Sequence, residues 1–390
     1  MVMNDTRKTV LDLTSAALFN NDISIPENTD WNAVFNEVKN QNIVSLLYPV
    51  IENRNIPDNI QNNWKKLRDQ YLLNNARNIT CHISIHQLMN KANIPYVILK
   101  GVASGVYYPN YLLRGYGDVD FLVNKDDFQK AADLLSTNGF VFTEKNEKHR
   151  NYKKNNVTYE LHNSVISIPT GKLHSLFDEF FSDIIDKSVP FKHNNSICMI
   201  PSDRHNAVIL LIHTAEHMSE SGIGLRHLLD WAAFAGTMDD HFFIHEMLPI
   251  LKEMGLWHFC CILTALCTKY LGLREFDWIT DIDSEYLDKL IDDVFESGEF
   301  GNLQRNRISN SSDSNSIRSY LTFLNKRAKR LSLIKKFPIL LPLGWVYLFL
   351  RYMYRIVIGT RSFKKARVDT KIFNERTEIN KEWHLFEKEE

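Results

Sequence analysis

The stretch Leu99–Val123, LKGVASGVYYPNYLLRGYGDVDFLV, decides the fold that the sequence predicts. It begins at the end of a short apolar run, Tyr96–Leu99, whose continuity and shortness are typical of a buried strand. Lys100 and Gly101 break that run, and small residues then start a helix. A second strand is predicted at Val119–Val123. The stretch should therefore form a strand, a tight turn, a short helix and another strand.

The chain that follows extends this pattern into a small sheet. Apolar residues at helical spacing from Phe128 onward predict a second helix, and Phe140–Phe142 is predicted as a third strand. The segments 149–154 and 157–162 flank Asn155-Asn156, which is a hairpin signal because asparagine tolerates positive φ. The resulting order of elements, β-α-β-α-β-β-β, predicts a compact unit that mixes strands and helices.

Helical regions lie on both sides of this unit in the sequence. We expect an N-terminal helical region over residues 1–95, the α/β core over 96–200 and a C-terminal helical region over 201–307. A polar linker and helix is predicted at 308–325, followed by a basic and apolar tail at 326–390. The fold class is therefore predicted to be α+β, a small mixed-sheet core flanked by N- and C-terminal helices.

Composition and charge are those of an ordinary globular protein. The 390 residues are 44% hydrophobic and 24% charged, which excludes a disordered chain, a collagen-like chain or a disulfide scaffold. The formal net charge of −1 gives no overall attraction to nucleic acid, so we expect no nucleic-acid partner. The five cysteines form no CxxC pair, and the N-terminus has no apolar segment of signal-peptide length. We therefore expect free thiols and a cytoplasmic location.

Three carboxylates of the core are placed to share a cation. Asp118 and Asp120 are two residues apart at one end of a strand, so their side chains point to the same face. Glu160 joins them if its strand, after the hairpin, neighbours theirs. Carboxylates held so close repel one another unless a cation lies between them, and Mg²⁺ prefers such oxygen ligands together with substrate phosphates. Gly101, at a strand-to-helix junction, would let backbone amides approach a triphosphate.

The order of these elements resembles the polymerase-β-like nucleotidyltransferase superfamily, whose pattern is hG[GS], then [DE]h[DE]h, then h[DE]h. Leu99–Val123 is more closely similar to a bacterial family of uncharacterised nucleotidyltransferases, often found beside surface-polysaccharide genes. The shared features are the LKG, the YY, an arginine, the D-hydrophobic-D segment and the later Glu160-Leu161-His162. The specific match covers about residues 96–163.

The resemblance implies in-line attack by an acceptor hydroxyl on the α-phosphorus of a nucleoside triphosphate such as ATP, with release of pyrophosphate. Asp118 and Asp120 would bind Mg²⁺ or Mn²⁺, and Glu160 would be the third metal carboxylate and help to deprotonate the acceptor. That acceptor could be a sugar, a lipid-linked glycan precursor, a small metabolite or a protein hydroxyl. The alternative is a catalytically inactive nucleotide-binding or regulatory module of the same fold.

The same resemblance places the phosphates at the turn after the first strand. Gly101 and Ser104 would contact them, although this chain has Val102-Ala103 where the superfamily has serine or glycine directly after the glycine. Lys100 and Arg114 are candidates to neutralise phosphate charge. The other interpretation of these two cations is ordinary surface solubility.

A separate pattern, His213-Thr-Ala-Glu216-His217, matches the H-x-x-E-H sequence of inverted zinc proteases. On a helix His213 and His217 share a face, so both could bind zinc, but a zinc hydrolase needs a third ligand and the sequence offers no obvious one. The competing interpretation is that these histidines pack between helices or line the acceptor side of the cleft.

The C-terminal tail concentrates positive charge. Residues 326–367 contain twelve Lys or Arg and no Asp or Glu, and they enclose Phe337–Leu350, fourteen residues without a charge. A membrane span needs about twenty apolar residues. An apolar segment with basic flanks suits the surface of an anionic membrane, which would place the protein peripherally at the inner face of the plasma membrane. The alternatives are a terminal helix docked on the body and, as a third option, a nucleic-acid contact.

Overall fold

The computed structural model describes residues 4–145, 149–165, 172–220, 222–279, 282–298 and 340–357, with single residues at 328, 334, 383, 385 and 386. The chain folds into two compact units. The first comprises residues 1–215, 225–291 and 384–390, and the second comprises residues 216–224 and 292–383. The first unit contains the whole sheet and every residue of the predicted core, so it is described first.

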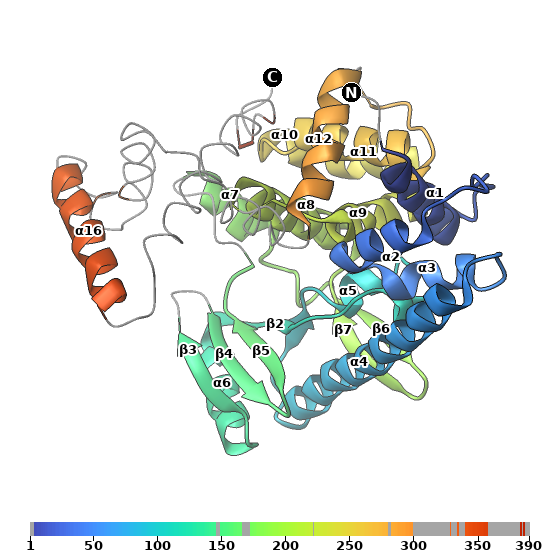
Figure 1. Ribbon diagram of the computed structural model, residues 1–390. Helices are drawn as coiled ribbons and strands as arrows, with labels where there is room; N and C mark the ends of the chain where they lie inside the picture. The colour runs from blue at the N-terminus through green and yellow to red at the C-terminus, as the bar shows by residue number, and fades with distance from the viewer. Residues whose placement is uncertain are drawn as a thin grey trace. The chain divides into compact units, whose positions relative to one another are not determined.

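The first unit contains a five-stranded mixed sheet, whose strands β2 to β5 are drawn at the lower left of Figure 1. In spatial order its strands are β1 (Tyr96–Ile98), β2 (Val119–Val123), β5 (Val157–His162), β4 (His149–Lys154) and β3 (Val141–Lys145). The pairing of β2 with β5 is parallel, and the other three pairings are antiparallel. The predicted order β-α-β-α-β-β-β is confirmed, with the third strand starting one residue later than expected.

Burial differs between the strands of the sheet. Every residue of β1 and β2 is buried, as expected for strands covered on both faces, whereas β5 alternates buried and half-buried residues. Asn155 and Asn156 join β4 to β5 with φ values of 50° and 60°. Two successive positive φ values define the hairpin turn that the asparagine pair predicts.

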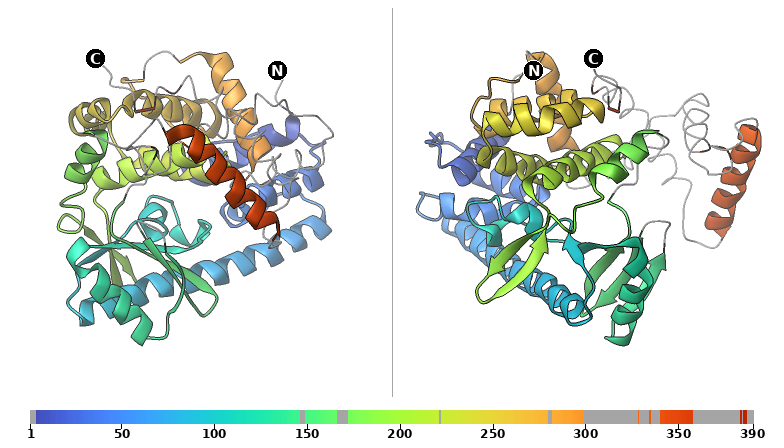
Figure 2. Two further views of the ribbon diagram at one scale, coloured as in Figure 1. Left: turned by 90° about the vertical axis from the view of Figure 1, so that its left-hand side faces the viewer. Right: turned by 180° about the vertical axis from the view of Figure 1, so that it is seen from behind.

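Two helices pack against this sheet. The long α4 (Asp58–Lys91) runs past β1 and β2, which can be followed in both views of Figure 2, and α6 (Phe128–Thr137) contacts β5. Their apolar side chains join those of the strands in one hydrophobic core. Between β1 and β2 lie two short elements, α5 (Val102–Gly105) and the 3₁₀-helix η1 (Tyr111–Leu113). Of the residues predicted to meet phosphate, Ser104 lies in α5, Lys100 and Gly101 directly precede α5, and Arg114 directly follows η1.

Further helices complete the first unit on either side of the core in sequence. The N-terminal region forms α1 (Asp5–Phe19), α2 (Trp31–Asn40) and α3 (Val44–Ile51). After the sheet come α7 (Lys172–Phe180), the hairpin of β6 (Val189–His193) and β7 (Ser196–Ile200), α8 (Asp203–Glu220) and α9 (Leu225–Thr237). The part of α8 from Glu216 onward belongs to the second unit. The remaining elements are the 3₁₀-helix η2 (Lys125–Asp127), the π-helix η3 (Phe242–Met247), α10 (Leu248–Glu253), α11 (Trp257–Leu271) and α12 (Ser284–Ser297), whose last turn belongs to the second unit.

In the second unit, α16 (Leu341–Val357) is the long helix that the structure describes. The polar linker and helix predicted at 308–325 and most of the tail at 326–390 lie outside the described residues. Across the described part of the chain, no helix is both long and apolar enough to span a membrane.

The predicted α+β fold class is confirmed, because helices precede and follow a small mixed sheet along the chain. The prediction of free thiols is also confirmed. None of the five cysteines forms a disulfide, and four of them are buried.

Candidate active site

The pairing of β2 with β5 brings the three predicted carboxylates together. Asp120 on β2 is the register partner of Glu160 on β5, and side chains at paired positions project from the same face of a sheet. Asp118 lies two residues before Asp120 and therefore shares that face. From the sequence, we expected Glu160 to join the aspartates only if β5 and β2 are neighbouring strands. That condition is met.

Asp120 is buried and accepts hydrogen bonds from a lysine and a histidine. Its side chain is 8% exposed, and its Oδ1 accepts hydrogen bonds from Lys100 Nζ and His162 Nε2, each at 3.2 Å. Burial alone would raise the pKa of Asp120, but Lys100 and His162 hold it well below its usual range. Asp120 is therefore a carboxylate that stays ionised inside the protein.

Asp118 experiences the opposite balance of forces. Burial raises its pKa, and the negative charges of Asp120 and Glu160 raise it further, although Lys100 acts in the opposite direction. This repulsion is what a divalent cation among the three carboxylates would relieve. The carboxylate oxygens are also the ligand type that Mg²⁺ and Mn²⁺ prefer, so the residues fit such an ion.

Two histidines adjoin the carboxylates. His162 Nε2 lies 3.4 Å from Glu160 Oε2, and the His162 ring lies 5.0 Å from that of His149, its register partner on β4. Burial alone would lower the pKa of His162, but its hydrogen bonds to Asp120 and Glu160 raise it overall. For His149, burial and the neighbouring His162 lower the pKa. Both imidazoles thus belong to the immediate surroundings of the carboxylates.

The turn after β1 has the conformation that its glycine predicts. Gly101 has φ +66° and ψ −109°, and a Cβ at this position would lie 2.4 Å from His82 Nε2. Ser104, three residues on, is only 2% exposed, and its amide donates to the Gly101 carbonyl. Because α5 has four residues, its peptide dipoles add little to phosphate binding. The turn backbone and Lys100 remain the parts best placed to meet a phosphate.

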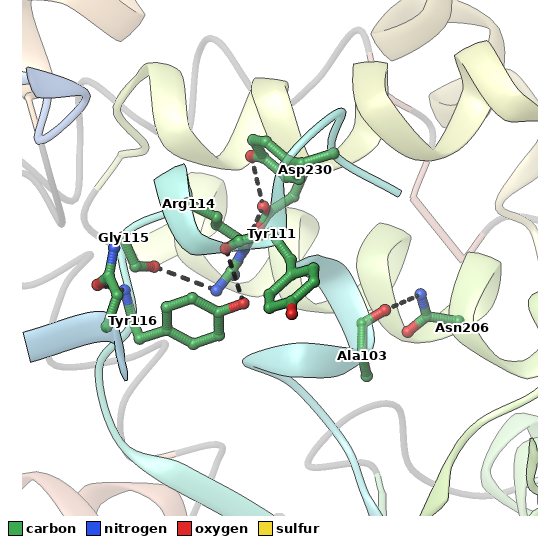
Figure 3. Close-up of polar contacts among 9 residues, drawn as sticks. Ala103, Tyr111, Arg114, Gly115, Tyr116, Asn206 and Asp230 are labelled. Carbon is green, nitrogen blue, oxygen red and sulfur yellow. Dashed lines mark hydrogen bonds and ion pairs between the residues drawn. The ribbon is translucent and has the colours of Figure 1, made fainter. Parts of the chain in front are cut away.

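Arg114 forms a buried ion pair, drawn in Figure 3. Its side chain is 7% exposed, and its Nε and Nη2 donate to the two carboxylate oxygens of Asp230 on α9, each at 2.7 Å. Nη1 donates to the carbonyl of Gly115 at 3.1 Å. Burial alone would lower the pKa of Arg114, but Asp230 raises it overall. Three of its nitrogens therefore already have partners within the fold, and its role toward phosphate stays a prediction.

Neighbouring hydrogen bonds extend this network around the segment between β1 and β2. Tyr108 donates its hydroxyl to Asp230 at 2.8 Å, and Tyr116 donates its hydroxyl to the Tyr111 carbonyl at 3.0 Å. Asn206 on α8 donates to the Ala103 carbonyl at 3.0 Å, as Figure 3 also shows. The segment that carries the phosphate candidates is thus attached to α8 and α9 by buried polar contacts.

His82 on α4 packs against the Gly101 turn. The side chain is fully buried, and its Nδ1 lies 2.7 Å from the Asn78 carbonyl, so Nδ1 carries the proton that it donates. Its Nε2 has no hydrogen-bond partner among the described residues. Burial lowers the pKa of His82 to about 4, which keeps the imidazole neutral at physiological pH.

We expect His82 to make the protein less stable as the pH falls. Between pH 6.5 and about 4 the unfolded chain binds a proton at His82 and the folded chain does not, so protonation favours unfolding. A pKa lowered from 6.5 to about 4 corresponds to about 3 kcal/mol of unfolding free energy lost between pH 7 and pH 4. The measurement is urea unfolding across this range for wild type and His82→Asn.

Asparagine keeps an amide donor near the position of Nδ1 and does not titrate. Between pH 7 and pH 4, the unfolding free energy of wild type should therefore fall further than that of His82→Asn, and the difference should equal the loss expected from His82. Identical pH dependences for the two proteins would contradict the buried neutral histidine.

A third imidazole, that of His227, lies next to the H-x-x-E-H pattern for which zinc binding was considered. The ring of His213 on α8 stacks on that of His227 on α9, with centroids 5.4 Å apart and planes at 23°. His217 lies one helical turn beyond His213 on α8. The packing of His213 between two helices agrees with the competing interpretation. The zinc hydrolase stays a hypothesis, which metal analysis of the purified protein would test.

Some residues of this site escaped the sequence argument. His162 was part of the family-like motif but had no assigned role, and nothing pointed to His149 or His82. Asp230 also had no assigned role, and its carboxylate binds Arg114. The apolar and aromatic neighbours of Arg114, Leu112-Leu113 before it and Tyr116 after it, are the local signal that could have indicated its burial.

Carboxylates on two strands that follow a strand, a glycine turn and a helix are the pattern that the resemblance describes for a nucleotidyltransferase. The family model described as uncharacterised nucleotidyltransferase matches residues 27–272, which include the sheet and the carboxylates. The chain therefore belongs to this uncharacterised nucleotidyltransferase family. No curated protein matches the chain.

Proposed function

We propose that the protein transfers a nucleoside monophosphate from a nucleoside triphosphate to a hydroxyl acceptor and releases pyrophosphate. One observation carries the proposal: Asp120 and Glu160 are in register on neighbouring parallel strands, with Asp118 on the same face. Family membership supports the nucleotidyltransferase class. The acceptor oxygen forms a bond to the α-phosphorus while the bond from that phosphorus to the pyrophosphate oxygen breaks.

The chain's own groups have the following roles in the proposal. Asp118, Asp120 and Glu160 hold divalent Mg²⁺ or Mn²⁺, which when bound stabilises charge on the entering and leaving oxygens. Glu160 also accepts the proton of the acceptor hydroxyl. Lys100 and the backbone of Gly101 contact the phosphates. For Ser104 and Arg114, whose side chains are buried, we propose that they act by shaping the segment that carries Gly101.

The test is calorimetric titration of ATP, GTP, CTP and UTP with Mg²⁺ into wild type and Asp118→Asn. Wild type should bind at least one of the four triphosphates in a metal-dependent manner. Asp118→Asn should lose that binding because a carboxylate ligand of the metal is gone. Nucleotide binding that is unaffected by Asp118→Asn would argue against the site. Metal-dependent binding without turnover on any acceptor would favour the alternative, an inactive nucleotide-binding or regulatory module.

For the acceptor we propose a hydroxyl of a surface-polysaccharide precursor. The support is the similarity to a family often found beside surface-polysaccharide genes. Incubation with radiolabelled triphosphate and candidate sugar acceptors would test this, with release of pyrophosphate as the readout. Transfer to a protein or to a small metabolite, and not to a sugar, would assign the acceptor to another class.

We further propose that α16 binds the surface of an anionic membrane, at the inner face of the plasma membrane. Four large apolar side chains of this helix, each at least 50% exposed, follow the spacing i, i+3, i+4, i+7 and so form one stripe; they are Leu343, Val346, Tyr347 and Leu350. The sequence around this helix, residues 326–367, carries twelve basic and no acidic residues. An apolar stripe with basic surroundings is typical of a helix that lies in a membrane interface.

The prediction is that full-length protein sediments with vesicles containing phosphatidylserine and not with neutral phosphatidylcholine vesicles. Replacing Leu343 and Leu350 by glutamate should reduce the bound fraction at least tenfold, because two apolar anchors are lost and two negative charges meet an anionic surface. Val141 and Phe142 on β3 are also exposed apolar residues, so their replacement by glutamate is the matched control. Equal sedimentation with both vesicle types would contradict binding to an anionic membrane surface.

A further inference from the structure

Imidazole ligands lie beside the carboxylate site on β4 and β5. His149, Glu160 and His162 each offer one ligand atom, and these three atoms all lie within 4.8 Å of one another. Ligands at neighbouring corners of an octahedral ion with bonds of about 2.1 Å lie about 3 Å apart. Small side-chain adjustments would therefore bring two nitrogens and one oxygen onto a single ion.

The sheet fixes this group on a rigid scaffold. His149 and His162 are register partners on antiparallel strands, and their rings lie 5.0 Å apart. Glu160 and His162 are two residues apart on β5 and share a face, with Nε2 to Oε2 at 3.4 Å. A site built on paired strands holds its ligand geometry better than a site built on loops.

The chemistry of these ligands differs from that of the neighbouring aspartates. Mg²⁺ binds oxygen ligands and retains water, whereas imidazole nitrogen suits Zn²⁺, Co²⁺ and other first-row transition ions. Asp118 and Asp120 offer only carboxylate oxygen. The two sets of ligands therefore suit different ions, with Glu160 available to both.

We propose that His149, Glu160 and His162 form a transition-metal site next to the aspartates, so that the protein binds a first-row transition dication through imidazole nitrogen. This inference deepens the proposed function, since it names the class of ion that shares Glu160 with the nucleotidyl-transfer site.

The test uses full-length protein freed of metal by a chelator and titrated with Co²⁺, followed by calorimetry and visible absorption. Wild type should bind Co²⁺ at least tenfold more tightly than His149→Phe, a variant that keeps an aromatic ring against His162 and removes the ligand nitrogen. His174 is a histidine on α7 outside this group, so His174→Phe is the matched control and should bind Co²⁺ as wild type does. Equal Co²⁺ affinity in wild type and His149→Phe would overturn the proposal.

A second measurement needs no variant and so does not depend on how His149→Phe folds. Pulsed electron paramagnetic resonance of the wild-type protein loaded with Cu²⁺, an ion that imidazole suits, should show coupling to directly bound imidazole nitrogen. A spectrum with no nitrogen coupling at one equivalent of Cu²⁺ would overturn the proposal.

These results are separable from the fate of the proposed function. If Co²⁺ binds through His149 and no triphosphate binds with any metal, the transition-metal site stands and nucleotidyl transfer fails. If triphosphate binding depends on Asp118 and Co²⁺ binding does not depend on His149, nucleotidyl transfer stands and the transition-metal site fails.

Discussion

Asp118→Asn should lower the rate of nucleotidyl transfer about a thousandfold or more and leave the metal-free protein at least as stable as wild type. The loss of rate follows from removing a metal carboxylate, since about 4 kcal/mol of transition-state stabilisation corresponds to about a thousandfold. The stability follows from repulsion. Burial and the charges of Asp120 and Glu160 raise the pKa of Asp118, so the ionised form destabilises the folded, metal-free protein at neutral pH. The neutral amide removes that repulsion.

Asp120→Asn should also abolish transfer, but with the opposite effect on stability. Lys100 and His162 hold the pKa of Asp120 low, so its charge contributes stability that is present at neutral pH and is lost as the pH falls through the acidic range. Replacing Asp120 by asparagine removes that contribution and leaves Lys100 and His162 without the negative charge that they face. The two substitutions are thus predicted to have opposite effects on stability, although both are predicted to abolish transfer.

The measurements are initial rates of pyrophosphate release and thermal unfolding in the presence of a chelator. Asp126→Asn is the matched control, since this aspartate lies on η2, outside the group of three carboxylates. Turnover by Asp118→Asn close to that of wild type would contradict the catalytic assignment. Equal destabilisation by Asp118→Asn and Asp120→Asn would contradict the electrostatic account while leaving the catalytic role intact.

The part of the fold that holds these carboxylates could be predicted because its signals are local. A continuous apolar run marks β1, the asparagine pair marks the hairpin, and both signals depend on residues adjacent in sequence. The side-chain period of a strand then places Asp118 and Asp120 on one face. The β2–β5 pairing was a condition and not a deduction, because nothing local in the sequence states which strands will be neighbours.

The partners that the sequence did not reveal are distant along the chain. Arg114 and Asp230 are 116 residues apart, and His82 meets Gly101 from a helix whose pattern shows only which face is apolar. A charged residue in isolation suggests solvent or substrate, and only its three-dimensional neighbours show that it is buried. Burial also changes the chemistry, because a buried arginine must have its hydrogen-bond donors satisfied within the fold.

Arg114→Met should cost roughly 3–5 kcal/mol of unfolding free energy, because it leaves the Asp230 carboxylate buried without its cation. Asp230→Leu should cost a similar amount by leaving the guanidinium buried. In contrast, the triple variant Tyr108→Phe/Arg114→Met/Asp230→Leu removes the pair together with the hydroxyl that also donates to Asp230. Replacing a whole buried polar group by apolar side chains is often close to neutral, so this variant should recover most of the stability.

Denaturant unfolding without nucleotide measures this recovery in wild type, the two single variants and the triple variant. The same measurement shows whether Arg114 stabilises the fold or neutralises phosphate charge. If the guanidinium mainly neutralised phosphate charge, Arg114→Met would weaken triphosphate binding and leave the stability of the ligand-free protein unchanged. The bidentate pair predicts the reverse order of effects, a large loss of stability without nucleotide that Asp230→Leu and Tyr108→Phe largely restore. A triple variant no more stable than Arg114→Met would show that the ion pair does not account for the burial of Arg114. Because Arg114, directly after η1, and Asp120 on β2 lie on one short stretch of chain, restored stability should also restore metal-dependent nucleotide binding.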